Sequence, residues 1–264
     1  MRGQLSETAL SRIEQSLPRP SCLAKIGQLL PESMALYCGP DSDMDIAVVC
    51  LRDAADYFEE ARLALHECKA GMEWYRVEED PPVEKMAIFV GRFFADDVAL
   101  RIYSTAEHVA AFLQAYLGIS EDDLEPYSSG RTSKASMVGH YLMEEEPDHE
   151  MTKAVKQFIG REECKFALDY RNKWVHDQRP RIADLGMVWK REKRWRKTEK
   201  GRTLSFGMGD QPSITVDTLA STMQAALEGV ARLLDDTFAV FWETIKEVVD
   251  IRETVDGFQV IHTF

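Results

Sequence analysis

Apolar residues return at alternating intervals of three and four positions along most of this chain, which is the period of an amphipathic helix. One such run extends from about Ser42 to Met72, a second from about Val83 to Leu117, and a third from about Thr215 to Asp250. Gly118 directly follows the second run, where a glycine commonly ends a helix. The pattern therefore predicts long helices that pack together through their apolar faces.

Shorter elements are expected before and between these helices. Prolines divide residues 1–40 into short helices joined by turns. Residues 120–133 are polar and favour a loop, while residues 134–145 fit a short helix. A further major helix is expected within residues 147–180, and Gly160 weakens its middle, which leaves room for a kink or a split.

The period of the hydrophobic pattern changes to two between residues 188 and 208. Gly201 lies between the two alternating runs, which is typical of a β-hairpin. The expected fold class is therefore mainly α, a bundle of long helices with a β-hairpin inserted at about residues 187–208. Residues 1–40 are expected to pack on the bundle and residues 41–264 to form the main helical domain, with a weakly extended tail from Gly257.

Composition restricts the class of protein. The formal net charge of −13 over 264 residues argues against a broad basic surface that coats nucleic acid. Five widely spaced cysteines without a C-x-x-C pair indicate neither a disulfide framework nor a zinc site, so we expect a reducing cytoplasm. We see no long apolar run and no secretion signal, and we expect neither a membrane span nor export.

The candidate chemistry lies in the segment Arg171-Asn172-Lys173-Trp174-Val175-His176. An Arg keeps its charge at all working pH values, whereas a His exchanges a proton near neutrality. The two together combine a phosphate clamp with an acid or base, which suffices for RNA cleavage without a metal. Asn172 and His176 are four residues apart and so share a helix face, with Asp169 one turn before Asn172 as a possible group to orient the His.

The position of Arg171 is unusual for a charged side chain. Its spacing from Cys164, Leu168 and Val175 places it on an apolar stripe, where a buried guanidinium needs an anion or a carboxylate partner. The simpler alternative is a surface Arg and His on an amphipathic helix, paired locally with Asp169 or Asp177. An Arg and a His at this spacing are frequent by chance, so the motif gains weight from the Asn after the Arg, from Trp174-Val175 between them, and from its position near the end of a long helix.

At these residues the chain resembles the HEPN superfamily, whose hallmark is R-x(4–6)-H, often beginning Arg-Asn, on a bundle of long helices. The match by motif covers the hexapeptide, and the match by architecture extends from about residue 42 to 250. The hairpin before the last helix is similar to that of one HEPN subgroup. Many HEPN proteins are metal-independent endoribonucleases that act as homodimers with their two motifs face to face, and others are inactive scaffolds or RNA binders.

The resemblance implies attack by an RNA 2′-hydroxyl on the adjacent phosphate, which leaves a 2′,3′-cyclic phosphate. His176 is then the general acid or base, Arg171 stabilises the phosphorane, and Asn172 orients the phosphate or the His. It also implies a role in defence or stress response, with an antitoxin or a nucleotidyltransferase as a candidate partner, and no cofactor. The alternatives are a non-catalytic HEPN module that binds RNA or protein, and a structural helical protein in which Arg171 only makes a buried ion pair.

A second group of candidate residues is the basic hairpin, where the sequence between positions 189 and 202 contains eight Lys and Arg residues and only two Glu. Basic residues interleaved with tryptophans suit contact with a nucleic-acid backbone and stacking on bases. The alternative is a solvated arm, or an arm that docks on the acidic body of a second subunit. The candidate RNA-binding residues are Lys190, Arg191, Lys193, Arg194, Trp195, Arg196, Lys197, Lys200 and Arg202.

Two further patterns are interpreted as helix starts. The segment Ser42–Val49 is similar to the Ser-Asp-x-Asp strand of nucleotidyltransferases, whose paired carboxylates bind Mg²⁺, but no Gly-Ser phosphate loop precedes it. An acidic first helical turn is the favoured interpretation. His149 sits at another expected helix start, and because no histidine has metal-ligand spacing, we expect capping there and no metal site.

Overall fold

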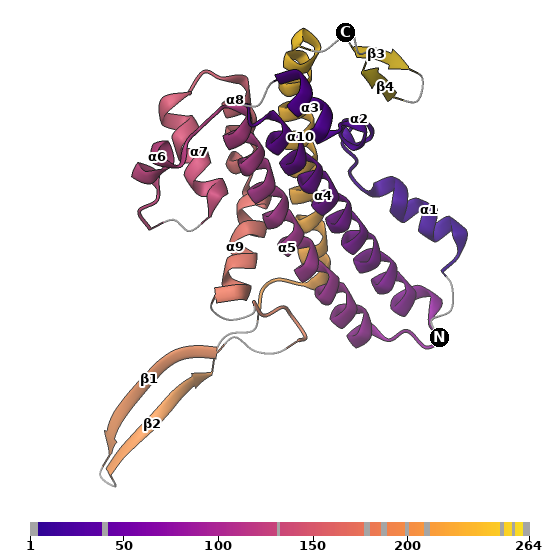
Figure 1. Cartoon of the computed structure of the whole chain (residues 1–264). Helices are drawn as coiled ribbons and strands as arrows, with labels where there is room; N and C mark the ends of the chain where they lie inside the picture. Colours follow the sequence, from indigo (N-terminus) through magenta and orange to yellow (C-terminus); the bar gives the residue numbers. More distant parts are fainter. Residues whose placement is uncertain are drawn as a thin grey trace.

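The computed structural model describes residues 5–38, 42–130, 133–176, 180–185, 189–198, 201–208, 212–248, 251–254 and 257–260. Only the backbone is described for 33, 35–37, 189–198, 202–208, 248, 251–254 and 257–260. Most of the described chain is helical, so the mainly α prediction is confirmed (Figure 1). No helix in these ranges combines the length and the apolar content that crossing a membrane requires.

The three longest helices form the centre of the molecule. They are α4 (Met44–Glu73), α5 (Glu84–Tyr116) and α10 (Val216–Val248), as the hydrophobic period predicts. Asp43 and Asp45 lie at the N-cap and in the first turn of α4, so this segment is a helix start, as favoured above, and not a strand. A short π-helix, η1 (Trp74–Glu78), leads out of α4 towards α5.

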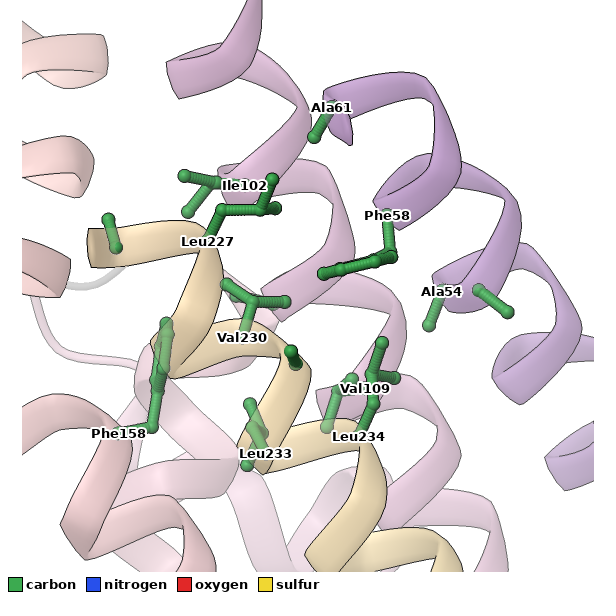
Figure 2. Packing of buried hydrophobic residues seen from close by; sticks show 14 of the residues in the cluster. Ala54, Phe58, Ala61, Ile102, Val109, Phe158, Leu227, Val230, Leu233 and Leu234 are labelled. Carbon is green, nitrogen blue, oxygen red and sulfur yellow. The ribbon is translucent and has the colours of Figure 1, made fainter. Parts of the chain in front are cut away.

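The core lies where α4, α5 and α10 meet (Figure 2). Phe58 of α4, Ile102 of α5 and Leu227 of α10 each have an exposed fraction of zero. Burying a side chain of this size contributes about 1.5–3 kcal/mol, so these contacts dominate the stability of the bundle. Close helix approach depends on glycine, for example at Gly91 of α5, where an added Cβ would lie 2.5 Å from Sδ of Met72.

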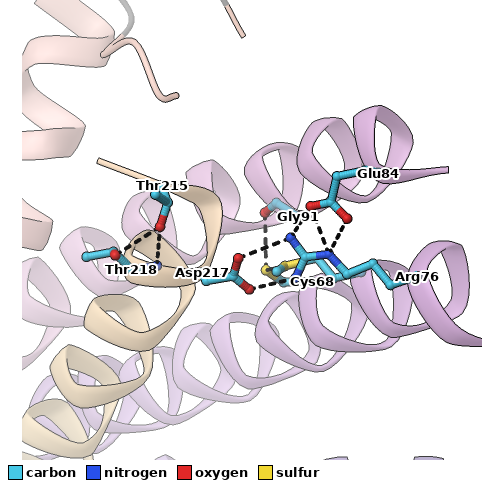
Figure 3. A network of polar contacts seen from close by, with 8 residues as sticks. Cys68, Arg76, Glu84, Gly91, Thr215, Asp217 and Thr218 are labelled. Atoms are coloured by element: carbon cyan, nitrogen blue, oxygen red, sulfur yellow. Dashed lines mark hydrogen bonds and ion pairs between the residues drawn. The ribbon is translucent and has the colours of Figure 1, made fainter. Parts of the chain in front are cut away.

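The guanidinium of Arg76 connects α5 and α10 at one end of the bundle (Figure 3). Arg76 of η1 donates hydrogen bonds to Glu84 at the start of α5 and, at 2.7 Å, to Asp217 at the start of α10. These hydrogen bonds with two carboxylates raise the pKa of Arg76, whose side chain is a quarter exposed. The contact ties together the beginnings of two helices that are far apart in the sequence.

The second half of the chain departs from the prediction at the expected loop, and at Gly160 it shows the split that the sequence allowed. The expected loop 120–133 instead contains α6 (Glu121–Leu124) and the 3₁₀-helix η2 (Glu125–Tyr127), because Ser120 and Asp123 form a capping box. The expected helix within 147–180 is two helices, α8 (Glu150–Gly160) and α9 (Glu162–His176), which split after Gly160 where Arg161 is extended. The short helix α7 (Lys134–Glu145) is confirmed.

The N-terminal segment consists of α1 (Glu7–Ser16), α2 (Leu23–Gln28) and α3 (Pro31–Cys38), and each contacts α4. A domain boundary at residue 40 stays a prediction. His149 caps α8 by accepting a hydrogen bond from the backbone N–H of Met151 at 3.2 Å, as expected for a helix start. The first three helices therefore extend the bundle through contacts with α4.

Two antiparallel strand pairs complete the described chain. The backbone of β1 (Trp189–Thr198) pairs with that of β2 (Gly201–Met208), with Trp195 opposite Leu204. The expected extended tail overlaps β4 (Gly257–Val260), which pairs with β3 (Ile251–Thr254). That the first pair is an insertion into a HEPN-like frame stays a prediction.

Candidate active site

The helix α9 holds the Arg/His motif in its last two turns. Its buried face is formed by Cys164, Ala167 and Tyr170, with exposed fractions of 0%, 0% and 3%. The predicted stripe through Arg171 and Val175 is therefore wrong, since Val175 is 45% exposed and Arg171 is only partly buried. The intervals of three from Cys164 to Tyr170 turn the buried face by about one residue, and they leave Arg171 at the edge of the core.

The guanidinium of Arg171 is shared between the two other motif residues. Its Nη1 donates to Oδ1 of Asn172 at 3.0 Å and lies 3.5 Å from Nε2 of His176, at the long end of hydrogen bonding. Because an Arg can only donate, this contact is a hydrogen bond in the tautomer whose Nε2 is unprotonated. His176 and Asn172 are both exposed, so an incoming group can reach the three side chains together.

The ring of Tyr103 on α5 supports this guanidinium from beneath. The Cζ atom of Arg171 lies 3.7 Å from the ring centroid, which is a close cation–π contact. The Nε atom of Arg171 is buried and makes no hydrogen bond with any described residue. Burial raises the pKa of Tyr103, and the negative charge of Glu107 raises it further, while Arg171 acts in the opposite direction. The ring thus stays neutral and presents its π-face to the cation.

A buried polar network fixes the end of α9 against α5. The hydroxyl of Tyr170 donates to Oδ1 of Asp96 at 2.6 Å, and Oδ2 of Asp96 lies 3.8 Å from Nε of Arg92. Arg92 also donates to the carbonyl of Pro180, which follows the motif. Arg92 and Asp96 are 5% and 4% exposed, so their charges are compensated inside the protein. The network holds both sides of the motif from one turn of α5.

A cavity of about 310 Å³ opens beside the motif. Its wall consists largely of aliphatic side chains from α5, α7, α8, α9 and α10, and Leu168, Asp169 and Asn172 supply one turn of α9. Tyr103 also lines it, so the cavity touches two of the three contacts of the Arg171 guanidinium, those with Tyr103 and Asn172. Arg171 and His176 lie beside this cavity and not in its wall.

Other predicted site residues have different positions. Asp169 lines the cavity and makes no hydrogen bond or ion pair with His176 or any other described residue, so no contact supports its predicted role in orienting the His. Asp177 and Lys200 lie outside the described residues. The remaining basic residues of the hairpin lie on β1 or β2, and only their backbone is described.

Arg171 forms no ion pair with a carboxylate within the described residues. The alternative of a purely structural protein requires such a buried ion pair, so it gains no support from these residues. Tyr103 and the network of Tyr170, Asp96 and Arg92 are not among the site residues predicted from the sequence. A signal for the network exists, because Arg92 and Asp96 are opposite charges four apart on a helix with few buried polar positions. Nothing in the sequence pairs Tyr103 with Arg171.

Within the described ranges, no group of three or more His, Cys, Asp or Glu side chains is placed to hold a metal ion. The five cysteines carry no disulfide, and Cys164 is buried on α9, where desolvation raises its pKa to about 11. Comparison with protein-family models, with curated proteins and with solved structures gave no match to this chain. Any function proposed for this chain therefore depends on the geometry of the Arg171, Asn172 and His176 site.

Proposed function

We propose that this protein is a HEPN-type endoribonuclease that cleaves RNA without a metal, at a site composed of two copies of the motif. The observation that carries the proposal is the shared contact of the Arg171 guanidinium with Asn172 and His176, at 3.0 and 3.5 Å. Three side chains of the resembling motif thus converge on one exposed point, on a helix of a mainly α bundle.

The geometry supports a division of roles among these residues. Nε2 of His176 accepts from Arg171 when it is unprotonated, and once released from that contact it is the general base for the 2′-hydroxyl. A phosphate entering the cluster replaces that acceptor as the partner of Arg171, whose charge then stabilises the phosphorane. Asn172 holds the guanidinium in place from the side. The product expected from this chemistry is a 2′,3′-cyclic phosphate and a 5′-hydroxyl.

A second copy of the chain supplies the rest of the proposed site. One copy offers only one Arg and one His, whereas cleavage needs both a base and an acid. Large apolar side chains are exposed on the helices that carry the site, including Phe89 and Phe93 of α5 at 53% and 55% and Val175 of α9. Exposed aromatic side chains are typical of surfaces that bind protein. We therefore propose a homodimer that buries these exposed side chains.

The basic hairpin is the proposed contact for RNA outside the cleavage site. It projects from the bundle beyond the end of α9 (Figure 1), and it follows the motif in the sequence. The rest of the chain is strongly acidic, and RNA is accordingly directed to this segment. A defence or stress role, with an antitoxin or nucleotidyltransferase as partner, stays a hypothesis that follows from the HEPN resemblance.

The primary experiment incubates purified protein with single-stranded RNA in EDTA. Wild type is compared with Arg171→Ala, His176→Ala and the control Lys173→Ala, which alters an exposed residue of the same turn. We expect cleavage by wild type and the control, loss of at least about a hundredfold in the two motif variants, and cyclic phosphate ends. Equal cleavage by all four proteins would assign the activity to a contaminant or another site.

A mixing experiment tests the composite site. Wild type is combined with increasing amounts of His176→Ala under conditions that allow subunits to exchange. If each site needs both copies, activity per wild-type chain falls in proportion to the wild-type fraction. Activity per wild-type chain that stays constant would show that one copy suffices. RNA binding without cleavage, with a motif that can be mutated at no cost in affinity, would instead favour the non-catalytic HEPN module.

A further inference from the structure

The cavity beside the motif is large enough to hold a small ligand. Its volume of about 310 Å³ lies at the lower end of the range for small-molecule sites, which suits one compact ring system. Aliphatic side chains such as Val109, Leu113 and Leu168 form most of its wall, and these favour the flat faces of an uncharged ring. What the cavity can bind is then decided by the chemistry of its polar rim.

Most polar groups at the rim already have partners. Glu107 accepts the backbone N–H groups of Lys134 and Ala135, at 2.8 and 3.4 Å, and thereby caps α7. The hydroxyl of Ser133 accepts from the N–H of Ser136 at 3.1 Å in the same cap. These groups are committed to the start of α7 and do not explain what the cavity binds.

Asp169 and Asn172 are the rim groups with capacity left for a ligand. Asp169 makes no hydrogen bond or ion pair with any described residue, so both of its carboxylate oxygens are open acceptors. Asn172 uses Oδ1 to accept from Arg171, and its Nδ2 therefore remains a donor. The two residues are three apart on α9 and offer one donor beside two acceptors.

We propose that this cavity binds a guanine base. Along one edge guanine carries an acceptor, O6, followed by two donors, N1–H and the exocyclic amine. This order complements the Asn172 amide and the Asp169 carboxylate. Adenine presents an unprotonated N1 at the same edge, which the carboxylate repels, and uracil offers only one donor. The ring faces contact the aliphatic wall, and a phosphate attached to the nucleoside extends toward Arg171.

The proposal deepens the proposed function and rests on it for the source of the base. A guanine can come from a nucleotide of the RNA strand, placed next to the cleaved phosphate, or from a free guanine nucleotide that occupies the cavity as a regulator. The recognition chemistry is the same in both cases. Binding itself requires no cleavage, so the proposal can be tested apart from nuclease activity.

The experiment measures binding by isothermal titration calorimetry. The probes are guanosine 3′-monophosphate, adenosine 3′-monophosphate, and two hexanucleotides with 2′-O-methyl groups throughout, one with a single guanosine and one with adenosine in its place. None of these probes can be cleaved by attack of a 2′-hydroxyl within a strand. We expect the guanine form of each pair to bind about tenfold or more tightly than the adenine form. A hexanucleotide that binds much more tightly than the mononucleotide identifies RNA as the source, and equal affinity identifies a free nucleotide.

Two variants locate the binding. Asp169→Asn is expected to abolish the preference for guanine, while Glu162→Gln, an equivalent change on an exposed residue of α9, keeps it. Gly139→Leu fills the cavity from α7, where an added Cβ meets only Cγ1 of Val155 at 3.9 Å, so the variant is expected to fold and lose binding. Its circular dichroism and Tm check the fold.

Equal affinity for guanine and adenine, no binding by wild type, or undiminished binding by a folded Gly139→Leu protein overturns the proposal. These results leave the proposed function intact if ordinary RNA is still cleaved in EDTA. Conversely, selective guanine binding with no cleavage of any RNA supports the cavity assignment and removes the nuclease. The two ideas therefore fail independently.

Discussion

The guanidinium of Arg171 stacks on the ring of Tyr103, with 3.7 Å between Cζ and the ring centroid. The contact joins the motif helix α9 to the long helix α5 and leaves the Nη1 end of the guanidinium directed at Asn172 and His176. A cation held on an aromatic face keeps its hydrogen-bonding edges available for an anion. Tyr103 is therefore a positioning residue for Arg171 in the proposed nuclease.

Two replacements of Tyr103 distinguish the contribution of its ring from that of its hydroxyl. Tyr103→Phe retains the π-face and should change kcat/KM for RNA cleavage by less than about twofold. Tyr103→Leu removes the face, and a cation–π contact of about 0.5–2 kcal/mol corresponds to a loss of about two- to thirtyfold. Steady-state cleavage of a short fluorogenic RNA measures both. An equal loss in the two variants would assign the effect to the hydroxyl and contradict the stacking argument.

The buried pair of Arg92 and Asp96 predicts a large stability effect from a single charge. Asp96→Ala leaves the Arg92 cation in the interior without its carboxylate and removes the acceptor of Tyr170, which should lower the free energy of unfolding by about 3–5 kcal/mol. Urea unfolding at neutral pH measures the loss. Asp97→Asn is the control, because this neighbour pairs with Arg101 at the surface and should cost at most about 1 kcal/mol. Comparable losses at both positions would contradict the burial argument.

Two glycines in helix interiors predict opposite responses to the same substitution. Gly91→Ala forces a Cβ to within 2.5 Å of Sδ of Met72 and 2.8 Å of Cγ2 of Val216, so it should destabilise the protein by about 1–3 kcal/mol. Gly139→Ala meets no atom nearer than 3.9 Å and should stabilise by up to about 1 kcal/mol through helix propensity. Thermal unfolding of both variants tests the pair, and the same sign of change in both would refute the packing argument.

The buried thiol of Cys68 predicts a loss of stability at alkaline pH. Burial raises the pKa of Cys68 from 9.0 to about 12, and its Sγ donates to the carbonyl of Gly91 at 3.1 Å. Above pH 9 the unfolded chain releases this proton while the folded chain keeps it, so the free energy of unfolding falls as pH rises toward 12. One proton contributes a slope of about 1.4 kcal/mol per pH unit.

Cys68→Ala measures this contribution. The variant should lose stability less steeply than wild type in urea unfolding between pH 9 and 10.5, whatever its stability at pH 7. Cys38→Ala is the control, since this thiol is only partly buried. A slope unchanged in Cys68→Ala would show that other groups govern the alkaline transition.

The hydrophobic period was sufficient to predict the long helices, because each of them buries one continuous face over many turns. The prediction failed where a few residues decide the structure. A capping box at Ser120 and Asp123 turned an expected loop into a helix, and the intervals of three in α9 moved the buried face away from Arg171. Short-range spacing of this kind is too weak a signal to weigh against the composition of the surrounding segment.

The motif could be found from sequence, but its supporting groups could not. Arg171, Asn172 and His176 are adjacent in the chain, so helix geometry alone brings them together. Tyr103 and Asp96 reach the motif from α5, at a separation of 68 residues for Tyr103 and Arg171 and 74 for Asp96 and Tyr170. Contacts between distant segments depend on how the helices pack, and a single sequence carries no record of that.

The basic hairpin predicts how RNA binding depends on salt. If Lys190, Arg191, Arg194 and Lys197 each neutralise a phosphate, replacing all four with Gln should reduce the slope of log K against log salt by about 3, at about 0.7 per contact for a single strand. Fluorescence anisotropy with a 2′-O-methyl RNA at several salt concentrations measures it. The control replaces Lys153, Lys156, Lys165 and Lys246, exposed residues of the bundle, and so changes the net charge equally. An equal reduction in both variants would mean that RNA responds only to total charge and does not bind the hairpin.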